Sequence, residues 1–279
     1  MMIAYIDVAA ARIVHVLRPW TAVMLLSVAY VVVSTIACRI TPKALTPIAS
    51  VIASLHMVAL SFASGALIVV IGQEMSKLGP WSIFASLCDP GNLLWETGAM
   101  ARIQNLNLVL KLMELHHTVW MSMSGRKNHA TQFQLFHNVV LLWMCWLQLG
   151  PNGAPVQWLP ILMNSVVHVF MYLCMYQVYR GGRAPFFSRL PVFQFVQGML
   201  TSVAILAVMT SRVLHDFVDP VIFERCGGSW KAIGLTASLG MCYPLGYLVL
   251  HKPDTDSWIA ERGLGLFFHV GRDLRQKQE

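Results

Sequence analysis

An amide and an imidazole stand together inside an otherwise apolar stretch of the chain. That stretch, from about residue 157 to 179, is long enough to cross a bilayer as a helix, and it contains Asn164 and His168. These two residues are four apart, so they share one face of the predicted helix, with Tyr172 one turn further on. Because an ionisable side chain is costly in hydrocarbon, His168 is predicted to have a function.

A second segment carries charges at helical spacing. Lys111 and Glu114 are three residues apart, so we expect them to pair, which makes two charges tolerable in a membrane helix. Thr118 lies on the same face, and His117 stands beside it. A purely structural ion pair is the alternative interpretation of Lys111 and Glu114.

A third segment places Gln134, His137 and Asn138 on one helical face, at i, i+3 and i+4. Helices with one polar face must turn it towards each other or towards water. We therefore predict a cavity lined by imidazoles and amides, in which His137 and His168 face each other. His56 has no spaced polar partner and is interpreted as a packing residue.

Composition places the chain among polytopic membrane proteins. Of its 279 residues, 56% are hydrophobic and 12% are charged, whereas soluble domains carry about 25% charged residues. We predict an all-α fold in one membrane domain, residues 1–279, with a hydrophilic tail from about residue 252. The lengths of the apolar runs predict seven spans, at roughly 20–38, 48–72, 105–123, 133–149, 157–179, 191–211 and 229–250.

The basic residues predict the orientation of these spans. Most Lys and Arg residues fall in cytosolic segments if the N-terminus is lumenal and the C-terminus cytosolic, as the positive-inside rule requires. The net charge of +7 is therefore attributed to topology. Because the basic residues are scattered over loops and are not clustered with aromatic residues, we expect no nucleic-acid partner.

Two cysteines, Cys88 and Cys226, fall in predicted lumenal loops, where an oxidising environment allows them to form a disulfide. The sequence has no Cys-x-x-Cys or Cys/His zinc spacing, and it offers fewer histidines than a membrane di-iron site needs, so we expect no metal. A seven-span transporter or receptor stays open as an alternative, although repeated broken helices are not evident.

The order of these motifs resembles that of the very-long-chain fatty acid elongases. The resemblance implies about seven transmembrane helices enclosing an acyl-binding tunnel in the endoplasmic reticulum membrane. It implies a 3-oxoacyl-CoA synthase that condenses a long-chain acyl-CoA with malonyl-CoA, without a tightly bound cofactor, among membrane lipids and other enzymes of the elongation cycle. It rests on Lys111-x-x-Glu114-x-x-x-Thr118, a histidine box, Asn164-Ser-Val-Val-His168-Val-Phe-Met171-Tyr172 and Gln194-Phe-Val-Gln197.

The chain departs from the family pattern at two places. Where the family has His-x-x-His-His, this sequence has Gln134, His137 and Asn138, and the Asp of the family's Glu-x-x-Asp-Thr element is replaced by His117. Two interpretations follow. Either the site is rewired and His117 has taken over a role of the box, or the chain is an inactive or regulatory paralogue that binds acyl-CoA.

The catalytic roles follow from side-chain chemistry. His137 or His168 is expected to receive or activate the acyl group, because imidazole is an acyl acceptor and a base near neutral pH. Gln134, Asn138 and Asn164 are expected to donate hydrogen bonds to the developing oxyanion. The predicted substrate contacts are Lys111, Glu114, Thr118, Tyr172, Gln194 and Gln197 in the cavity, and the cations Arg126, Lys127, Arg180 and Arg183 at the CoA phosphates.

Overall fold

The computed structural model of the chain describes residues 2–40, 45–77, 83–124, 129–181, 190–222 and 225–239, which form helices and turns without a strand. The predicted all-α fold is confirmed for these residues. The long helices are α1 (Met2–Leu17), α2 (Trp20–Ile40), α3 (Thr46–Ser76), α6 (Ala99–Met123), α7 (His129–Leu147), α8 (Trp158–Tyr179) and α9 (Leu190–Phe217). The short ones are α4 (Ile83–Cys88), α5 (Leu93–Glu96), and the 3-10 turns η2 (Gly150–Asn152) and η3 (Pro155–Gln157).

Several of these helices are long and apolar enough to cross a membrane, which makes the chain a multi-pass membrane protein. Within the described residues the segments of sufficient length and hydropathy are Trp20–Ala37, Thr46–Ser76, Pro155–Gln177 and Val196–Phe217. They match four of the predicted spans. Two further predicted spans are helical, as α6 and α7, but α7 has only a shorter apolar run, His137–Leu147. The last predicted span, 229–250, lies partly outside the described residues, of which 230–239 are helical.

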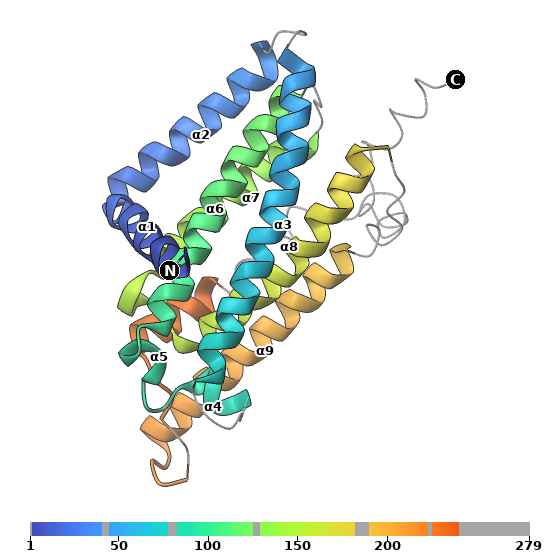
Figure 1. Cartoon of the computed structure of the whole chain (residues 1–279). Helices are drawn as coiled ribbons and strands as arrows, with labels where there is room; N and C mark the ends of the chain where they lie inside the picture. The colour runs from blue at the N-terminus through green and yellow to red at the C-terminus, as the bar shows by residue number, and fades with distance from the viewer. Residues whose placement is uncertain are drawn as a thin grey trace, which may run out of the picture.

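Helix α6 can carry polar side chains because protein, rather than lipid, surrounds it. It packs against α1, α2, α3, α5, α7 and α8 within the bundle (Figure 1). Its buried residues include Lys111, Glu114, His117 and Thr118. Such side chains are costly against hydrocarbon but are tolerated where neighbouring helices supply partners. The predicted span 105–123 is therefore a central helix that presents its polar side chains to other helices.

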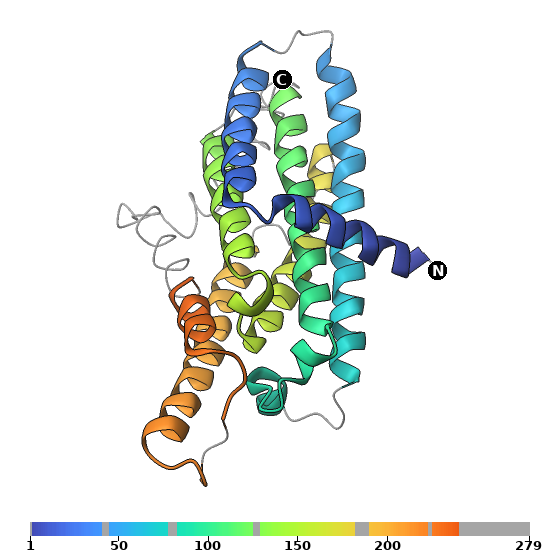
Figure 2. The same ribbon diagram turned by 90° about the vertical axis from the view of Figure 1, so that its left-hand side faces the viewer.

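Helix α1 precedes the first predicted span and was not predicted. It lies crosswise to α2 and α3 (Figure 2). Asp7 of α1 accepts a hydrogen bond from Arg102 Nε at 3.0 Å, and Arg102 Nη1 donates to Glu74 Oε1 at 2.6 Å. These ion pairs join α1 to α6 and to α3. Large apolar side chains, such as those of Tyr5 and Val16, are exposed on α1.

A disulfide joins two chain segments at the end of the bundle where α3 and α9 finish. Cys88 and Cys226 are bonded across 138 residues of sequence, so the predicted pairing is present. The backbones meet closely there, since Gly227 N donates to Cys88 O at 2.6 Å. A Cβ atom at Gly227 would lie 2.2 Å from the carbonyl oxygen of Asp89, so only glycine fits. We call this end of the molecule the disulfide end.

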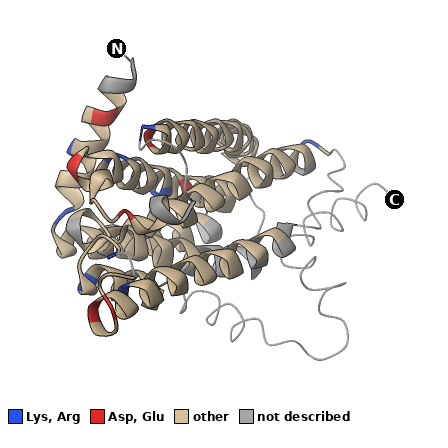
Figure 3. Cartoon of the chain, turned by 90° about the horizontal axis from the view of Figure 1, so that it is seen from below, with Lys and Arg blue, Asp and Glu red and all other residues tan. Residues whose placement is uncertain are grey.

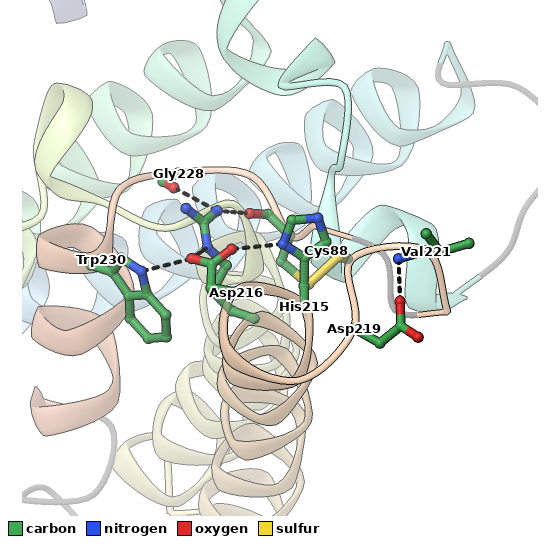
Figure 4. A network of polar contacts seen from close by, with 9 residues as sticks. Cys88, His215, Asp216, Asp219, Val221, Gly228 and Trp230 are labelled. Carbon is green, nitrogen blue, oxygen red and sulfur yellow. Dashed lines mark hydrogen bonds and ion pairs between the residues drawn. A yellow bond between two sulfur atoms is a disulfide. The ribbon is translucent and has the colours of Figure 1, made fainter.

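A network of polar contacts holds the cysteine-bearing loop against α9 (Figure 4). Arg212 donates from Nε to Asp216 Oδ2 at 2.9 Å and from Nη1 to the carbonyl oxygen of Cys226. Trp230 Nε1 donates to the same carboxylate at 2.9 Å, and His215 Nδ1 lies 2.6 Å from its other oxygen. We call these four side chains, together with the disulfide, the disulfide clamp.

The outer surface of the bundle is apolar. In the view along the bundle most of the ribbon carries no charge (Figure 3). Large hydrophobic side chains are exposed on the long helices, as expected for contact with lipid, and they include Val32, Leu55, Phe62, Phe170 and Val203.

Candidate functional site

A buried carboxylate lies between a lysine and a histidine in the interior of the bundle. Lys111 Nζ donates to both carboxylate oxygens of Glu114 at 3.0 Å, and His168 Nδ1 lies 2.9 Å from Glu114 Oε1. All three residues are only 3 to 4% exposed. The predicted pairing of Lys111 with Glu114 is present, and α8 adds a third member. We call these three residues the ion cluster.

The ion cluster orients the imidazole of His168. Its Nδ1 lies 2.9 Å from a carboxylate oxygen, and two bare acceptors at that distance would repel, so the proton is on Nδ1. A carboxylate on one ring nitrogen leaves the other, Nε2, as the basic atom. His168 is thereby held in the tautomer that a nucleophile or base needs.

The side-chain amide of Asn138 donates both of its hydrogens to residues of neighbouring helices. Its Nδ2 donates to Thr118 Oγ1 at 2.9 Å and to the hydroxyl of Tyr30 at 3.2 Å. Both amide hydrogens are therefore used, and Asn138 must release one bond before it donates to a substrate. Tyr30 was not predicted as part of this site. A tyrosine inside an apolar helix is a signal for it, since a buried phenol needs a hydrogen-bond partner.

His117 lies in the core with neither ring nitrogen hydrogen-bonded within the described residues. Its ring stacks on that of His56, with centroids 5.7 Å apart and planes at 6°. Tyr172 meets His117 edge-on at 5.6 Å and His168 at 5.4 Å. Nothing in the sequence indicated this contact, in which α3 carries the ring of His56 onto that of His117 on α6, and the interpretation of His56 as a packing residue stays a prediction. We call His56 and His117 the imidazole pair.

Unpaired buried nitrogens are costly. In the described part of the chain, three nitrogens of the imidazole pair have no partner, namely His56 Nδ1 and both ring nitrogens of His117. Each such group typically costs about 1 to 3 kcal/mol when it is left without a partner. Native structures retain such unpaired groups where a water molecule or a ligand supplies the missing hydrogen bond.

Comparison with known proteins identifies the family. Residues 15–251 match the family model described as "ELO: GNS1/SUR4 family". The chain belongs to the ELO family. It is similar to human "Very long chain fatty acid elongase 1", with 31% identity over 121 residues, which are 42% of this chain and 43% of that protein. The mouse protein of the same name is 30% identical over 121 residues, with the same coverage. These matches span less than half the length of either relative, and no solved structure matches the chain.

The remaining predicted catalytic residues of this ELO-family protein lie on α7 and α8. His137 on α7 is partly buried and interacts electrostatically with Lys111, Glu114 and His168. Asn164 is partly buried on α8, one turn before His168. The expectations that His137 faces His168 and that Asn164 contacts substrate stay predictions.

The predicted contacts at the edge of the site are less completely described. Gln197 is partly buried on α9, and Arg180 is exposed just after α8. Gln134 and Gln194 lie in α7 and α9, but their side chains are outside the described part, as are Arg126, Lys127 and Arg183. Within the described ranges, no three His, Cys, Asp or Glu residues form a group that could hold a metal ion.

Proposed function

We propose that this ELO-family protein elongates fatty acyl chains by condensing a long-chain acyl-CoA with malonyl-CoA to 3-oxoacyl-CoA, CO2 and CoA. The observation that carries the proposal is the contact of His168 with Glu114 inside the bundle, 2.9 Å from Nδ1 to Oε1. A buried histidine oriented by a carboxylate is a general base or nucleophile in acyl-transfer chemistry. The elongase names of the relatives support the same substrate class.

In the proposed reaction, His168 Nε2 receives or activates the acyl group while Glu114 stabilises the charge on the ring. The bond between the malonyl carbon and its carboxylate then breaks, and its electron pair forms the new carbon–carbon bond at the acyl carbon. Asn164, four residues before His168 on α8, donates a hydrogen bond to the developing oxyanion. His137 acts from α7 as the second imidazole.

The acyl chain is proposed to lie in a tunnel between seven helices, where each buried CH2 group contributes about 0.8 kcal/mol. Arg180 directly follows α8, at the end of that helix away from the disulfide end, so we place the CoA phosphates there, with Arg126, Lys127 and Arg183 as further cations. The proposed location is the endoplasmic reticulum membrane, with the N-terminus lumenal and the C-terminus cytosolic.

A second candidate is a paralogue that binds acyl-CoA and regulates active elongation enzymes without condensing. The engagement of Asn138 favours it, because both amide hydrogens bind Thr118 and Tyr30. Because the amide of Asn138 cannot carry a proton, its hydrogen bonds can stabilise the fold as readily as they can bind substrate.

Elongation in microsomes separates the two candidates. Microsomes that contain the protein are given labelled malonyl-CoA and a panel of acyl-CoAs, beside microsomes with His168→Ala. We expect a product two carbons longer from the unmodified protein and none from the variant. Correctly inserted protein that yields no product above the variant, but alters the activity of a co-expressed elongase, would favour the regulatory role.

A further inference from the structure

We propose that His56 and His117 deliver the proton that the condensation consumes, and that they do so as a pair. The inference rests on the proposed function, because it assigns two further residues to that reaction. The imidazole pair was not predicted from the sequence: His56 comes from α3 and His117 from α6, 61 positions apart.

The balance of the reaction requires a proton. The electron pair of the broken carboxyl bond is used in the new carbon–carbon bond, so none of it takes up a proton. The carbon–sulfur bond of the acyl-CoA also breaks, and its pair leaves with the sulfur as a thiolate. Formation of free CoA therefore requires one proton per turnover, which water supplies and an acid within the buried site must carry to the sulfur.

The ion cluster is poorly suited to carry this proton. The proton on His168 Nδ1 is fixed by Glu114 at 2.9 Å, and Lys111 is held by both oxygens of the same carboxylate. Removing either proton would leave Glu114 as a buried charge with weaker compensation. These groups are suited to orienting the reactants.

The imidazole pair has the opposite property. Among the residues that the structure describes, no carboxylate or carbonyl binds either nitrogen of His117, so neither tautomer is enforced. A neutral imidazole has one N–H and one acceptor nitrogen, and it can release a proton from one side and regain one on the other. The unpaired nitrogens therefore form a place where water or the departing sulfur can bind.

The position of the pair fits a path from the outside to the ion cluster. His56 is partly exposed, whereas His117 has no exposed surface. Tyr172 packs edge-on against both His117 and His168, so a single ring is in contact with both the imidazole pair and the ion cluster. His56 takes the proton from water, a water molecule at the unpaired nitrogens carries it between the two stacked rings, which do not hydrogen-bond to each other, and His117 passes it to the sulfur.

Substitutions that keep the ring but remove the nitrogens test the proposal. His117→Phe retains a stacking partner for His56 and removes the two unpaired nitrogens. We expect the variant to unfold at or above the temperature of the unmodified protein, while kcat for elongation falls about 100-fold and KM for acyl-CoA stays within about threefold. The matched control is His116→Gln, because His116 is the exposed neighbour on the same helix, and its kcat should be unchanged.

Two further variants separate proton transfer from packing. His56→Gln should lower kcat by a similar factor, and the double variant should be no worse than either single one, because the two rings act in one path. In His117→Ala, imidazole added to the buffer should restore part of the lost rate by entering the vacated space, and this rescue should not occur in His168→Ala combined with His117→Ala.

The outcomes distinguish this inference from the function on which it rests. Turnover of His117→Phe within twofold of His116→Gln, in a preparation where the unmodified protein elongates, would overturn the proton-delivery role alone. Unmodified protein that makes no elongated product overturns the proposed function and this inference together. A loss of rate without rescue by imidazole, accompanied by a lower unfolding temperature in both His117 variants, would show that the pair only packs.

Discussion

The disulfide clamp and the polar core, by which we mean the ion cluster together with the imidazole pair, use similar side chains in opposite ways. In the clamp, the carboxylate of Asp216 contacts Arg212, Trp230 and His215, and Arg212 also donates to the carbonyl oxygen of Cys226. In the polar core, three imidazole nitrogens have no partner among the described residues. In the clamp, the hydrogen-bonding groups stabilise the fold, whereas in the polar core some of them remain available to bind a ligand.

The same comparison explains why the two regions respond differently to change. A network in which every member is paired rigidifies the fold, so its loss is measured as stability. Unpaired groups lower stability and are retained where they bind or react. Substitutions in the clamp should therefore change unfolding more than activity, and substitutions in the core should do the reverse.

The largest effect is expected for His168→Ala. Condensation should fall by about 1,000-fold or more, since the variant loses the oriented imidazole, while the protein still inserts, because one span keeps its hydrophobicity without a single ring. Elongation of labelled malonyl-CoA and protease protection of the membrane fraction measure the two properties. Normal turnover of the variant would contradict the proposed mechanism.

Removing the disulfide is expected to be the largest change in stability. Cys88→Ser with Cys226→Ser opens a loop closed across 138 residues, which in the loop-entropy model contributes about 5 kcal/mol. Unfolding in detergent should occur at lower temperature, while KM for acyl-CoA at low temperature should be unchanged. Labelling of both cysteines as free thiols in non-reduced, correctly inserted protein would show that the bond is absent.

Glu114→Gln tests the ion cluster within the core. The variant leaves the charge of Lys111 buried without a counter-charge, which typically costs about 3 to 5 kcal/mol. Adding Lys111→Met should restore the unfolding temperature, because it removes the unpaired charge, but it should not restore elongation. Recovery of activity in the double variant would show that the pair is structural only, the alternative noted from the sequence.

His117→Asp tests whether the site is rewired. It places a second carboxylate near Glu114 and removes one ring of the imidazole pair, so we expect elongation to fall about tenfold or more. Gln134→His and Asn138→His, added together, should return part of the loss by supplying imidazoles elsewhere. An increase in elongation from the single change would instead support the paralogue interpretation.

The smallest effect is expected at the edge of the clamp. Trp230→Phe keeps most of the aromatic contact and loses one hydrogen bond to Asp216, 2.9 Å long, which is worth about 1 kcal/mol. Thermal unfolding measures the shift, and elongation should be unaffected. A loss of activity comparable to that of the core variants would mean that the two regions are coupled.

Local spacing predicted part of this structure. The Lys111–Glu114 pair follows from the rise of one helix, and the Cys88–Cys226 bond follows from the side of the membrane on which both loops were expected. The contacts between helices could not be predicted from residue spacing, because they depend on how each helix is rotated about its axis relative to its neighbour. The contacts of His168 with Glu114 and of His56 with His117 are of this kind.

Helix α1 was missed for a different reason. The helix has 16 residues, which is shorter than a membrane span, and charged residues interrupt its apolar pattern. The length of apolar runs, which predicted the spans, therefore does not indicate this helix. The predicted tail from residue 252 and the cations of the nearby loops lie outside the described residues. For these the sequence remains the source of the prediction.

The ion pairs that hold α1 also mark a position on α3 from which the distance to the imidazole pair can be given. Asp7, Arg102 and Glu74 are charged groups from three helices joined by two ion pairs, which makes the charges tolerable within a membrane bundle. His56 lies 18 residues before Glu74 on α3, or about 27 Å along a helix that rises 1.5 Å per residue. The hydrocarbon is about 30 Å thick, so Glu74 and His56 are separated along α3 by nearly the thickness of the hydrocarbon. If the chain has the proposed function, this separation lets the polar coenzyme stay in water near His56 while the acyl chain extends along the helices through the thickness of the lipid.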